Sequence, residues 1–126
     1  MAESIPVPAD PGDRGGLTLR QRAVERVTVT AALDTDGVHR YGVGLAKWTG
    51  RELPRADVVV SGDHVRAAVD VAVEWGRPLA ATAAETARNV TRVLGDLSGL
   101  TVDGVDVHIA AVIPPGAQPD QRRRLR

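Results

Sequence analysis

The sequence predicts an α+β fold of the split βαβ type, a two-layer sandwich with two helices on one face of a small antiparallel or mixed sheet. Residues 64–75 alternate apolar and polar side chains as a half-buried strand does, and residues 78–98 repeat apolar side chains at helical spacing. The elements follow the order strand, helix, strand, strand, helix, strand (β-α-β-β-α-β). A chain of 126 residues suffices for one such domain with one modest core.

The first half of the chain predicts a short strand, a helix and a long loop. Leu17–Leu19 alternates after two glycines and is predicted to be the first strand. Gln21–Leu33 is predicted to be the first helix, because apolar side chains recur in it at helical spacing. Its many β-branched residues keep a strand open as the alternative. The glycine-rich stretch 34–56 predicts a surface loop.

The second half predicts a hairpin, a helix and a last strand. Asp57–Ser61 and His64–Trp75 are predicted to pair, because the Gly-Asp dipeptide between them supplies the backbone angles of a tight turn. Pro78–Ser98 is predicted to be the second helix, and Gly99 to take the left-handed conformation that ends it. Residues 101–102 and 105–113 predict the last strand. The apolar stripe of the second helix comprises Leu79, Ala83, Ala87, Val90, Leu94 and Leu97.

Alternation in the two long strands assigns their side chains to two faces of the sheet. The inward row of the strand 64–75 ends at Trp75, which is predicted to lie in the core or at its edge. In the last strand, Ala111 and Ile113 are predicted to face the core. The opposite face is left open by the helices and mixes charges with alanines. The residues predicted on this face, as an interface with a partner, are Arg66, Ala68, Asp70, Ala72, Asp106, His108 and Ala110.

The two ends of the chain differ from its middle. Residues 1–15 are predicted to be a disordered Pro/Gly-rich arm, residues 16–113 the domain, and residues 114–126 a disordered basic tail. Sixteen basic and sixteen acidic residues give a net charge of zero. The tail holds four arginines and one aspartate, and the arm three acids and one arginine, so the domain between them carries −1. The domain therefore has no net attraction for polyanions such as nucleic acid.

Composition excludes several classes of protein. The chain has no cysteine, which excludes disulfide scaffolds and cysteine-based zinc or redox sites. Its only aromatic residues are Tyr41, Trp48 and Trp75, which disfavours recognition of single-stranded nucleic acid by stacking. No apolar stretch is long enough to span a bilayer, and residues 1–16 lack the apolar stretch of a signal peptide. We therefore expect a cytoplasmic protein.

No motif predicts a catalytic, cofactor-binding or metal site. His39, His64 and His108 lack the spacing of metal ligands and are interpreted as solvated loop, turn and strand residues. Ser61, Asp63 and His64 lie too close together in one hairpin to align as a catalytic triad, because neighbouring side chains point apart.

The predicted loop holds two further features. Its stretch Gly42–Lys47 lacks the spacing of a phosphate-binding loop, although a small-ligand site around Gly42–Gly50 stays open as an alternative. Trp48, close to Tyr41, is a candidate for contact with a partner.

The patterns and their order are similar to those of a known family. The first half shows Gly16-Leu17-Thr18-Leu19, an amphipathic helix and then Gly37-Val38. The second half shows Trp75-Gly76 in place of a usual Tyr-Gly, then Pro78, a helix ending in Leu97-Ser98-Gly99-Leu100, and Val102-x-x-Val105-x-Val107-x-Ile109. From Gly16 to about Val112 the chain resembles the bacterial alkaline-shock protein family, also called the Gls general-stress or envelope-stress family. Arg20 and Gln21 depart from the pattern, because family members often have a small or capping residue there.

The resemblance implies a non-enzymatic, cytoplasmic protein of the envelope stress response. It implies a homo-oligomer that is held near the cell membrane by a small membrane-anchored partner protein. The family has no known set of catalytic residues, so none is assigned to this chain. We expect assembly to use the open face of the sheet. A nucleic-acid-binding module on the same fold is the alternative, and the charge and the scarce aromatic residues disfavour it.

Overall fold

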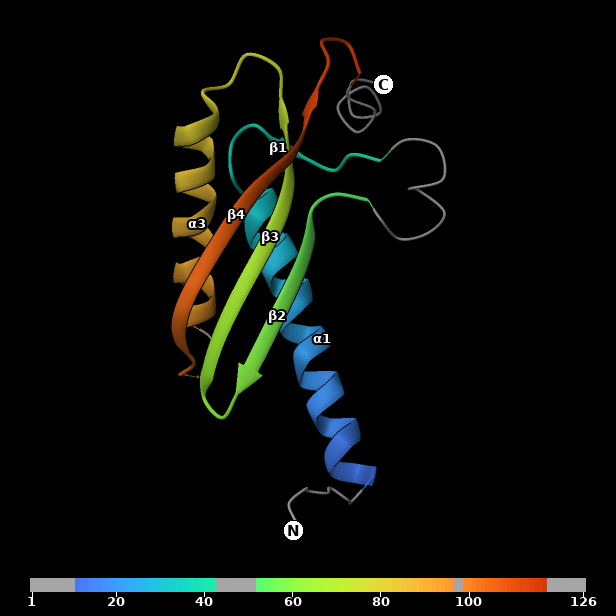
Figure 1. The fold of residues 1–126 in the computed structure, drawn as a ribbon, viewed down its shortest axis with the longest axis vertical. Helices are drawn as coiled ribbons and strands as arrows, with labels where there is room; N and C mark the ends of the chain where they lie inside the picture. Colours follow the sequence, from blue (N-terminus) through green and yellow to red (C-terminus); the bar gives the residue numbers. More distant parts are fainter. Residues whose placement is uncertain (1–10, 43–51, 97–98, 118–126) are drawn as a thin grey trace.

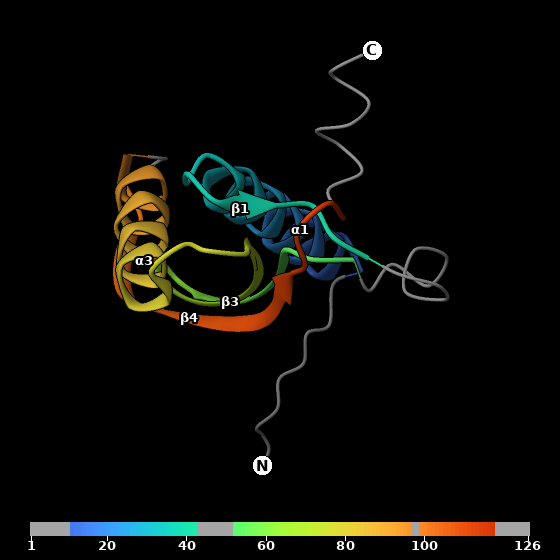
Figure 2. The same ribbon diagram turned by 90° about the horizontal axis from the view of Figure 1, so that it is seen from above.

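A computed structural model of the chain describes residues 11–42, 52–96 and 99–117. Its elements are helix α1 (Pro11–Leu33), strands β1 (Val38–His39), β2 (Arg55–Ser61) and β3 (His64–Glu74), helix α3 (Leu79–Asp96) and strand β4 (Thr101–Ile113). Both helices lie on the same side of the sheet, where α1 packs on β2 and α3 packs on β4 (Figure 1, Figure 2). The predicted α+β fold, with two helices on one face of a small mixed sheet, is confirmed.

Strand β3 is the centre of the sheet. Strand β2 pairs antiparallel with one edge of β3, from Ser61 opposite His64 to Arg55 opposite Asp70. The short strand β1 continues along this edge, and β4 pairs parallel with the other edge. The predicted hairpin is confirmed, with Gly62 in the left-handed conformation at φ 60°. The inward side chains of β3 are at most 1% exposed: Val65, Ala67, Val69, Val71 and Val73.

The predicted first strand is wrong, because Leu17–Leu19 belongs to helix α1. An alternation of three residues is too short to distinguish a strand from a helix, and helix formation propagates cooperatively from the residues that follow. Helix α1 also begins at Pro11, inside the stretch predicted to be a disordered arm. Without the first strand, no strand separates β3 from β4 in the described sheet, and α3 connects two neighbouring parallel strands.

Gln21–Leu33 is helical as predicted and ends at the predicted residue. Val24 and Ala31 are buried against the sheet, and so is Thr28, which the apolar pattern did not mark. The Thr28 hydroxyl donates a hydrogen bond to the carbonyl oxygen of Val24 at 2.8 Å. A buried hydroxyl is tolerated when it is hydrogen-bonded, and this bond within the helix provides the partner.

Residues 34–56 contain more structure than the predicted loop. They hold β1, the beginning of β2, and an isolated antiparallel bridge between Tyr41 and Leu53. Val38 is 3% exposed and packs in the core. Within this stretch, residues 43–51 lie outside the described residues, and with them Trp48 and most of the predicted alternative ligand site.

Helix α3 begins one residue later than predicted and presents a different stripe to the sheet, and residues 97–98, with Leu97 of the predicted stripe, lie outside the described residues. Its buried residues are Thr82, Thr86, Val90 and Leu94. Leu79, which was predicted to be buried, is 42% exposed, because the buried stripe is rotated toward the two threonines. The Thr82 hydroxyl donates to the Pro78 carbonyl at 2.9 Å, and the Thr86 hydroxyl donates to the Thr82 carbonyl at 2.8 Å. Gly99 has the predicted positive φ, at 68°.

Strand β4 contains two register shifts against β3, between Val65 and Arg66 and between Val71 and Ala72. Each shift places one extra residue in β4, Asp103 in the first case and Ala110 in the second. One extra residue moves every following side chain to the opposite face of the sheet. Beyond Ala110, Ala111 and Ile113 therefore occupy the open side, which corrects the prediction that they face the core.

We predict that Leu94→Ala lowers the free energy of unfolding by about 2–5 kcal/mol, since it removes a fully buried side chain and leaves a cavity. Leu79→Ala is the matched control, and we expect it to cost about 1 kcal/mol or less because Leu79 is partly exposed. Chemical denaturation followed by circular dichroism measures both. Equal losses in the two variants would contradict the orientation of α3.

Candidate functional site

The face of the sheet turned away from the helices is the candidate functional site, and we call it the open face. Alternate residues of the three long strands reach it, because residues paired across antiparallel or parallel strands lie on the same side. Asp70 is half-buried and the other eight residues are exposed. The open face consists of Arg55, Asp57, Val59, Arg66, Ala68, Asp70, Asp106, His108 and Ala110, and His64 lies on the same side of the sheet, beyond this face at the hairpin end.

Charged side chains form a row across one part of the open face. Asp70 of β3 lies opposite Arg55 of β2 and opposite His108 of β4. Arg55 Nη2 is 3.7 Å from Asp70 Oδ2, and His108 Nδ1 is 3.4 Å from Asp70 Oδ1. One carboxylate thus lies between two basic side chains. These pairs are exposed, so each contributes little to the stability of the fold.

A second charged contact joins β3 to β4. Arg66 Nη1 lies 3.7 Å from Asp106 Oδ2, and the Arg66 guanidinium extends over Gly104. A Cβ atom at Gly104 would be 3.0 Å from Arg66 Nη1. The missing side chain at Gly104 therefore lets the arginine lie over the strand, so that the arginine protrudes little from this part of the face.

The middle of the open face is small and acidic. Ala68 of β3 pairs with Asp57 on one side and with Asp106 on the other. Val59 lies at one edge of the face and is 65% exposed, an unusual position for a large apolar side chain. The face therefore combines three carboxylates, two arginines, one histidine and an exposed valine around a central alanine.

Six of the seven predicted strand residues lie on the open face, and Ala72 does not. Ala72 is 0% exposed, at the part of β3 that pairs with β1 on one edge and with β4 on the other. Ile113 is also 0% exposed, and neither residue belongs to the core cluster beneath the helices. The register shift before Ala111 places Ala111 opposite Ala72 and Ile113 opposite Glu74 at this end of the sheet.

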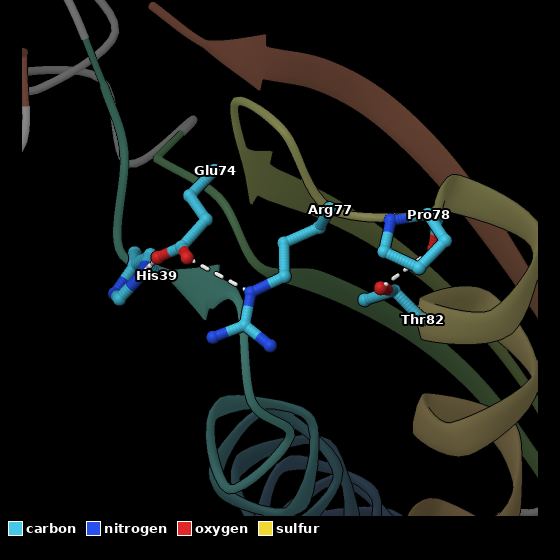
Figure 3. A network of polar contacts seen from close by, with 5 residues as sticks. All are labelled: His39, Glu74, Arg77, Pro78 and Thr82. Carbon is cyan, nitrogen blue, oxygen red and sulfur yellow. Dashed lines mark hydrogen bonds and ion pairs between the residues drawn. The ribbon is translucent and has the colours of Figure 1, made fainter. Parts of the chain in front are cut away.

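A polar cluster lies where β3 ends, beside the loop after α1 (Figure 3). His39 Nε2 is 2.6 Å from Glu74 Oε1, and Arg77 donates from Nε to Glu74 Oε2 at 2.8 Å. The Arg77 hydrogen bond, followed by the His39 contact, lowers the pKa of Glu74 against the opposing effect of burial, and the carboxylate raises the pKa of Arg77. The cluster therefore stabilises the fold above the ordinary Glu pKa of 4.5, and this contribution is lost as pH falls through the lowered pKa.

A second histidine–carboxylate pair joins the hairpin to β4. His64 Nδ1 lies 2.9 Å from Asp103 Oδ1, and Asp103 is the extra residue of the first register shift. The hydrogen bond and charge of Asp103 raise the pKa of His64 above its ordinary value of 6.5. The pair therefore favours the folded state below pH 6.5, and this contribution is lost as pH rises through the raised pKa.

The three histidines lie at separate places, each beside a different carboxylate: Glu74, Asp103 and Asp70. Among the described residues, no group of three or more histidine, aspartate or glutamate side chains is arranged to hold a metal ion. Ser61, Asp63 and His64 belong to the same hairpin, as predicted, and the near partner of His64 is Asp103. The arrangement supports electrostatic contacts on a surface.

Trp75 is an exposed residue that was predicted to lie in the core or at its edge. It follows the last residue of β3 and is 66% exposed. Its backbone amide donates to the carbonyl of Ile113 at 3.0 Å, and the turn that follows β3 begins at this residue. The following Gly76, with φ 92°, is the signal in the sequence that the strand ends before the tryptophan.

We predict that Asp103→Asn lowers the pKa of His64 toward 6.5, because the neutral amide removes the charge that favours the imidazolium. An NMR titration of the His64 ring protons measures this shift. Asp96→Asn, on the exposed end of α3, is the control and should leave the titration of His64 unchanged. A His64 pKa that is the same in both variants would contradict the assigned pairing.

Comparisons with known proteins concern both sequence and structure. No curated protein sequence matches the chain. Among solved structures, a triply substituted MamM CTD is similar, with 18% identity and a TM-score of 0.49 over 74% of this chain and 96% of that one. A zinc form of a MamM CTD variant has 16% identity and a TM-score of 0.49 over 74% of this chain and 87% of that one. At identities and TM-scores this low, no function of these proteins is assigned to this chain.

No described helix is long and apolar enough to cross a membrane.

The sequence profile of one family covers nearly the whole described part of the chain. The matching profile, which spans residues 9–114, is that of the alkaline shock protein 23 family, described as having a cell envelope-related function. The match confirms the family suggested by the sequence patterns, and the chain belongs to the alkaline shock protein 23 family.

Proposed function

We propose that this protein is a non-enzymatic structural component of the envelope stress response that acts by self-assembly and protein–protein interaction. The occupant that we propose for the open face is a second copy of the chain. One observation carries the proposal: the open face presents basic and acidic side chains in nearly equal number around the central Ala68. The family's cell envelope-related function supports the cell envelope as the place where this assembly would act.

Charge favours a copy of the same face over nucleic acid. The open face carries Asp57, Asp70 and Asp106 against Arg55 and Arg66, with His108 as a further basic group. Three carboxylates repel a phosphate backbone, whereas a mixed face can meet another mixed face with opposite charges in contact. Mixed charges of this kind determine which partner and which orientation are accepted.

Shape favours close approach of another flat surface. Ala68 is small, and Arg66 lies along Gly104 instead of standing up from the sheet. The exposed Val59 adds apolar area that would be buried in a contact. Two sheets that pack face to face lie about 10 Å apart, a distance that short side chains in the centre permit.

Self-assembly also fits the absence of converging reactive groups on this face. General acid–base chemistry needs a sheltered site in which a side chain and a substrate stay within hydrogen-bond distance. On the open face, Arg55 and His108 lie beside Asp70, and Arg66 lies beside Asp106, and all of these residues except Asp70 are exposed. We propose on this ground that the protein is not an enzyme.

The second part of the proposal concerns location. We propose that the protein is cytoplasmic and is held at the inner face of the membrane by a small membrane-anchored partner. Trp75 supports such a contact, because this large apolar residue is 66% exposed directly after the end of β3. Exposed tryptophan side chains are frequent anchors at protein interfaces.

We predict that Ala68→Arg weakens self-association by about tenfold or more, because a long side chain holds the two faces apart. The new arginine lies between Asp57 and Asp106, so it should leave the fold intact. Light scattering and sedimentation at tens of micromolar protein measure the association. Ala68→Glu places a third acid in the same row and should weaken it at least as much.

The matched control is Ala81→Arg, the same substitution at an exposed position of α3 on the other side of the molecule. This variant should associate like the wild type. A wild-type chain that stays monomeric, or an Ala68→Arg chain that associates as strongly as the wild type, would overturn assembly through the open face.

We predict that Trp75→Ala moves the protein from the membrane fraction to the soluble fraction of its own cells, since the partner contact is lost. Leu19→Ala, at a position that is 69% exposed on α1, is the control and should not change the distribution. Fractionation followed by immunoblotting measures both. Wild-type protein found wholly in the soluble fraction would contradict the proposed location.

A further inference from the structure

A groove of about 450 Å³ lies beside strand β2, between this strand and helix α1. Figure 1 shows β2 at one edge of the sheet, with α1 behind it. Residues next to β1 and β2 complete the lining of the groove. Its charged lining residues are Arg22, Glu25, Arg26, Arg40, Glu52 and Arg55.

Positive charge exceeds negative charge in this groove. Arg55 is already occupied, because it lies 3.7 Å from Asp70 on the open face. The other arginines still outnumber Glu25 and Glu52, although the domain as a whole carries −1. Three arginines are exposed and form no ion pair with a described residue: Arg22, Arg26 and Arg40. The groove therefore favours an anionic ligand.

Apolar side chains line the groove between its charged residues. Val29 and Ala56 are half-buried, and Pro54 is buried. A fitting ligand thus carries negative charges beside apolar groups, as a peptide with acidic side chains does. A nucleic-acid backbone fits less well, because it offers a continuous row of phosphates and is repelled by Glu25 and Glu52.

The hydrogen bonds of β3 show which backbone groups of the sheet are in use. The carbonyl oxygen of Asp63 accepts from the amide of Thr101, and the amide of Trp75 donates to the carbonyl oxygen of Ile113. Backbone groups alternate between the two edges of a strand. The odd-numbered residues along β3 therefore bond to β4, and the even-numbered residues bond to β2.

The outer edge of β2 consequently has unused backbone groups. Even-numbered residues of β3 lie opposite odd-numbered residues of β2, as Asp70 lies opposite Arg55. Among the described residues, no strand pairs with the other edge of β2. The N–H and C=O groups of Ala56, Val58 and Val60 therefore point to this free edge, and Ala56 also lines the groove.

We propose that the groove binds an extended acidic segment of a partner protein, which adds to the free edge of β2 as a further strand. Strand addition gains affinity from backbone hydrogen bonds and specificity from alternate side chains. Alternate side chains of the added strand point to the helix layer, where Arg22 and Arg26 lie, so we expect acidic residues at these positions. This interaction is separate from self-association through the open face.

The probe for this site is a fluorescent synthetic peptide of about eight residues in which valine and glutamate alternate. Fluorescence anisotropy with the full chain should show saturable binding that added salt weakens. A peptide with lysine in place of glutamate also alternates charged residues with valine but reverses the charge. We expect it to bind at least about tenfold more weakly.

The double variant Arg22→Glu, Arg26→Glu should bind the glutamate peptide about tenfold or more weakly, because two cations of the groove become anions. Arg20→Glu is the matched control, since it makes the same change at an exposed position of α1 that does not line the groove. This control should bind like the wild type. Circular dichroism checks that both variants keep their helices.

Hydrogen exchange tests the strand addition itself. The bound glutamate peptide should slow exchange at the amides of Ala56, Val58 and Val60, which gain a partner. The amides of Asp57 and Val59 are bonded to β3 already and should change little.

Three results would overturn the inference. The first is a wild-type chain that does not bind the glutamate peptide, or a double variant that binds it as tightly as the wild type. The second is unchanged exchange at the three outward amides in the bound state. The third is binding of phosphatidylglycerol vesicles, and not of the peptide, through Arg22 and Arg26, which would make the groove a lipid site.

Discussion

The structure depends on one constraint, the burial of the inward side chains of strand β3 together with the pairing of both its edges. Its inward side chains are valines and one alanine, all essentially inaccessible to solvent, and both of its edges are hydrogen-bonded to other strands. A small core without phenylalanine gains its stability from this close packing of small apolar groups, so each neighbour has a defined place. Helix α3 returns the chain so that β4 runs parallel to β3, and α1 covers the other half of the sheet.

The register of β4 against β3 then determines the surface. Between its two shifts, Gly104–Ile109 pairs regularly, which aligns Asp106 with Ala68 and His108 with Asp70. The first shift places Asp103 beside His64, and the second places Ala111 opposite Ala72 and Ile113 opposite Glu74. The first shift thus brings Asp103 to His64, and the second marks the end of the open face. The charged residues between the two shifts stay exposed. Bulges of this kind commonly redirect side chains at the edges of sheets.

The charges on the open face are better explained by recognition than by stability. Exposed ion pairs at 3.4 to 3.7 Å contribute little to folding, and the chain places three of them on one face. The same groups strongly affect which surface is accepted as a partner, because like charges in contact are costly once water is removed.

Periodicity in the sequence determined the core strand, the hairpin, the second helix and six residues of the candidate face, because burial imposes a period of two on strands and a period of 3.6 on helices. The zero net charge and the lack of cysteine likewise follow from composition alone. Tertiary structure alone decided the helical conformation of Leu17–Leu19, the parallel pairing of β3 with β4, the burial of Ala72 and the exposure of Trp75. The physical reason is that a single extra residue in one strand reverses all later side chains, and only the partner strand shows where that residue lies.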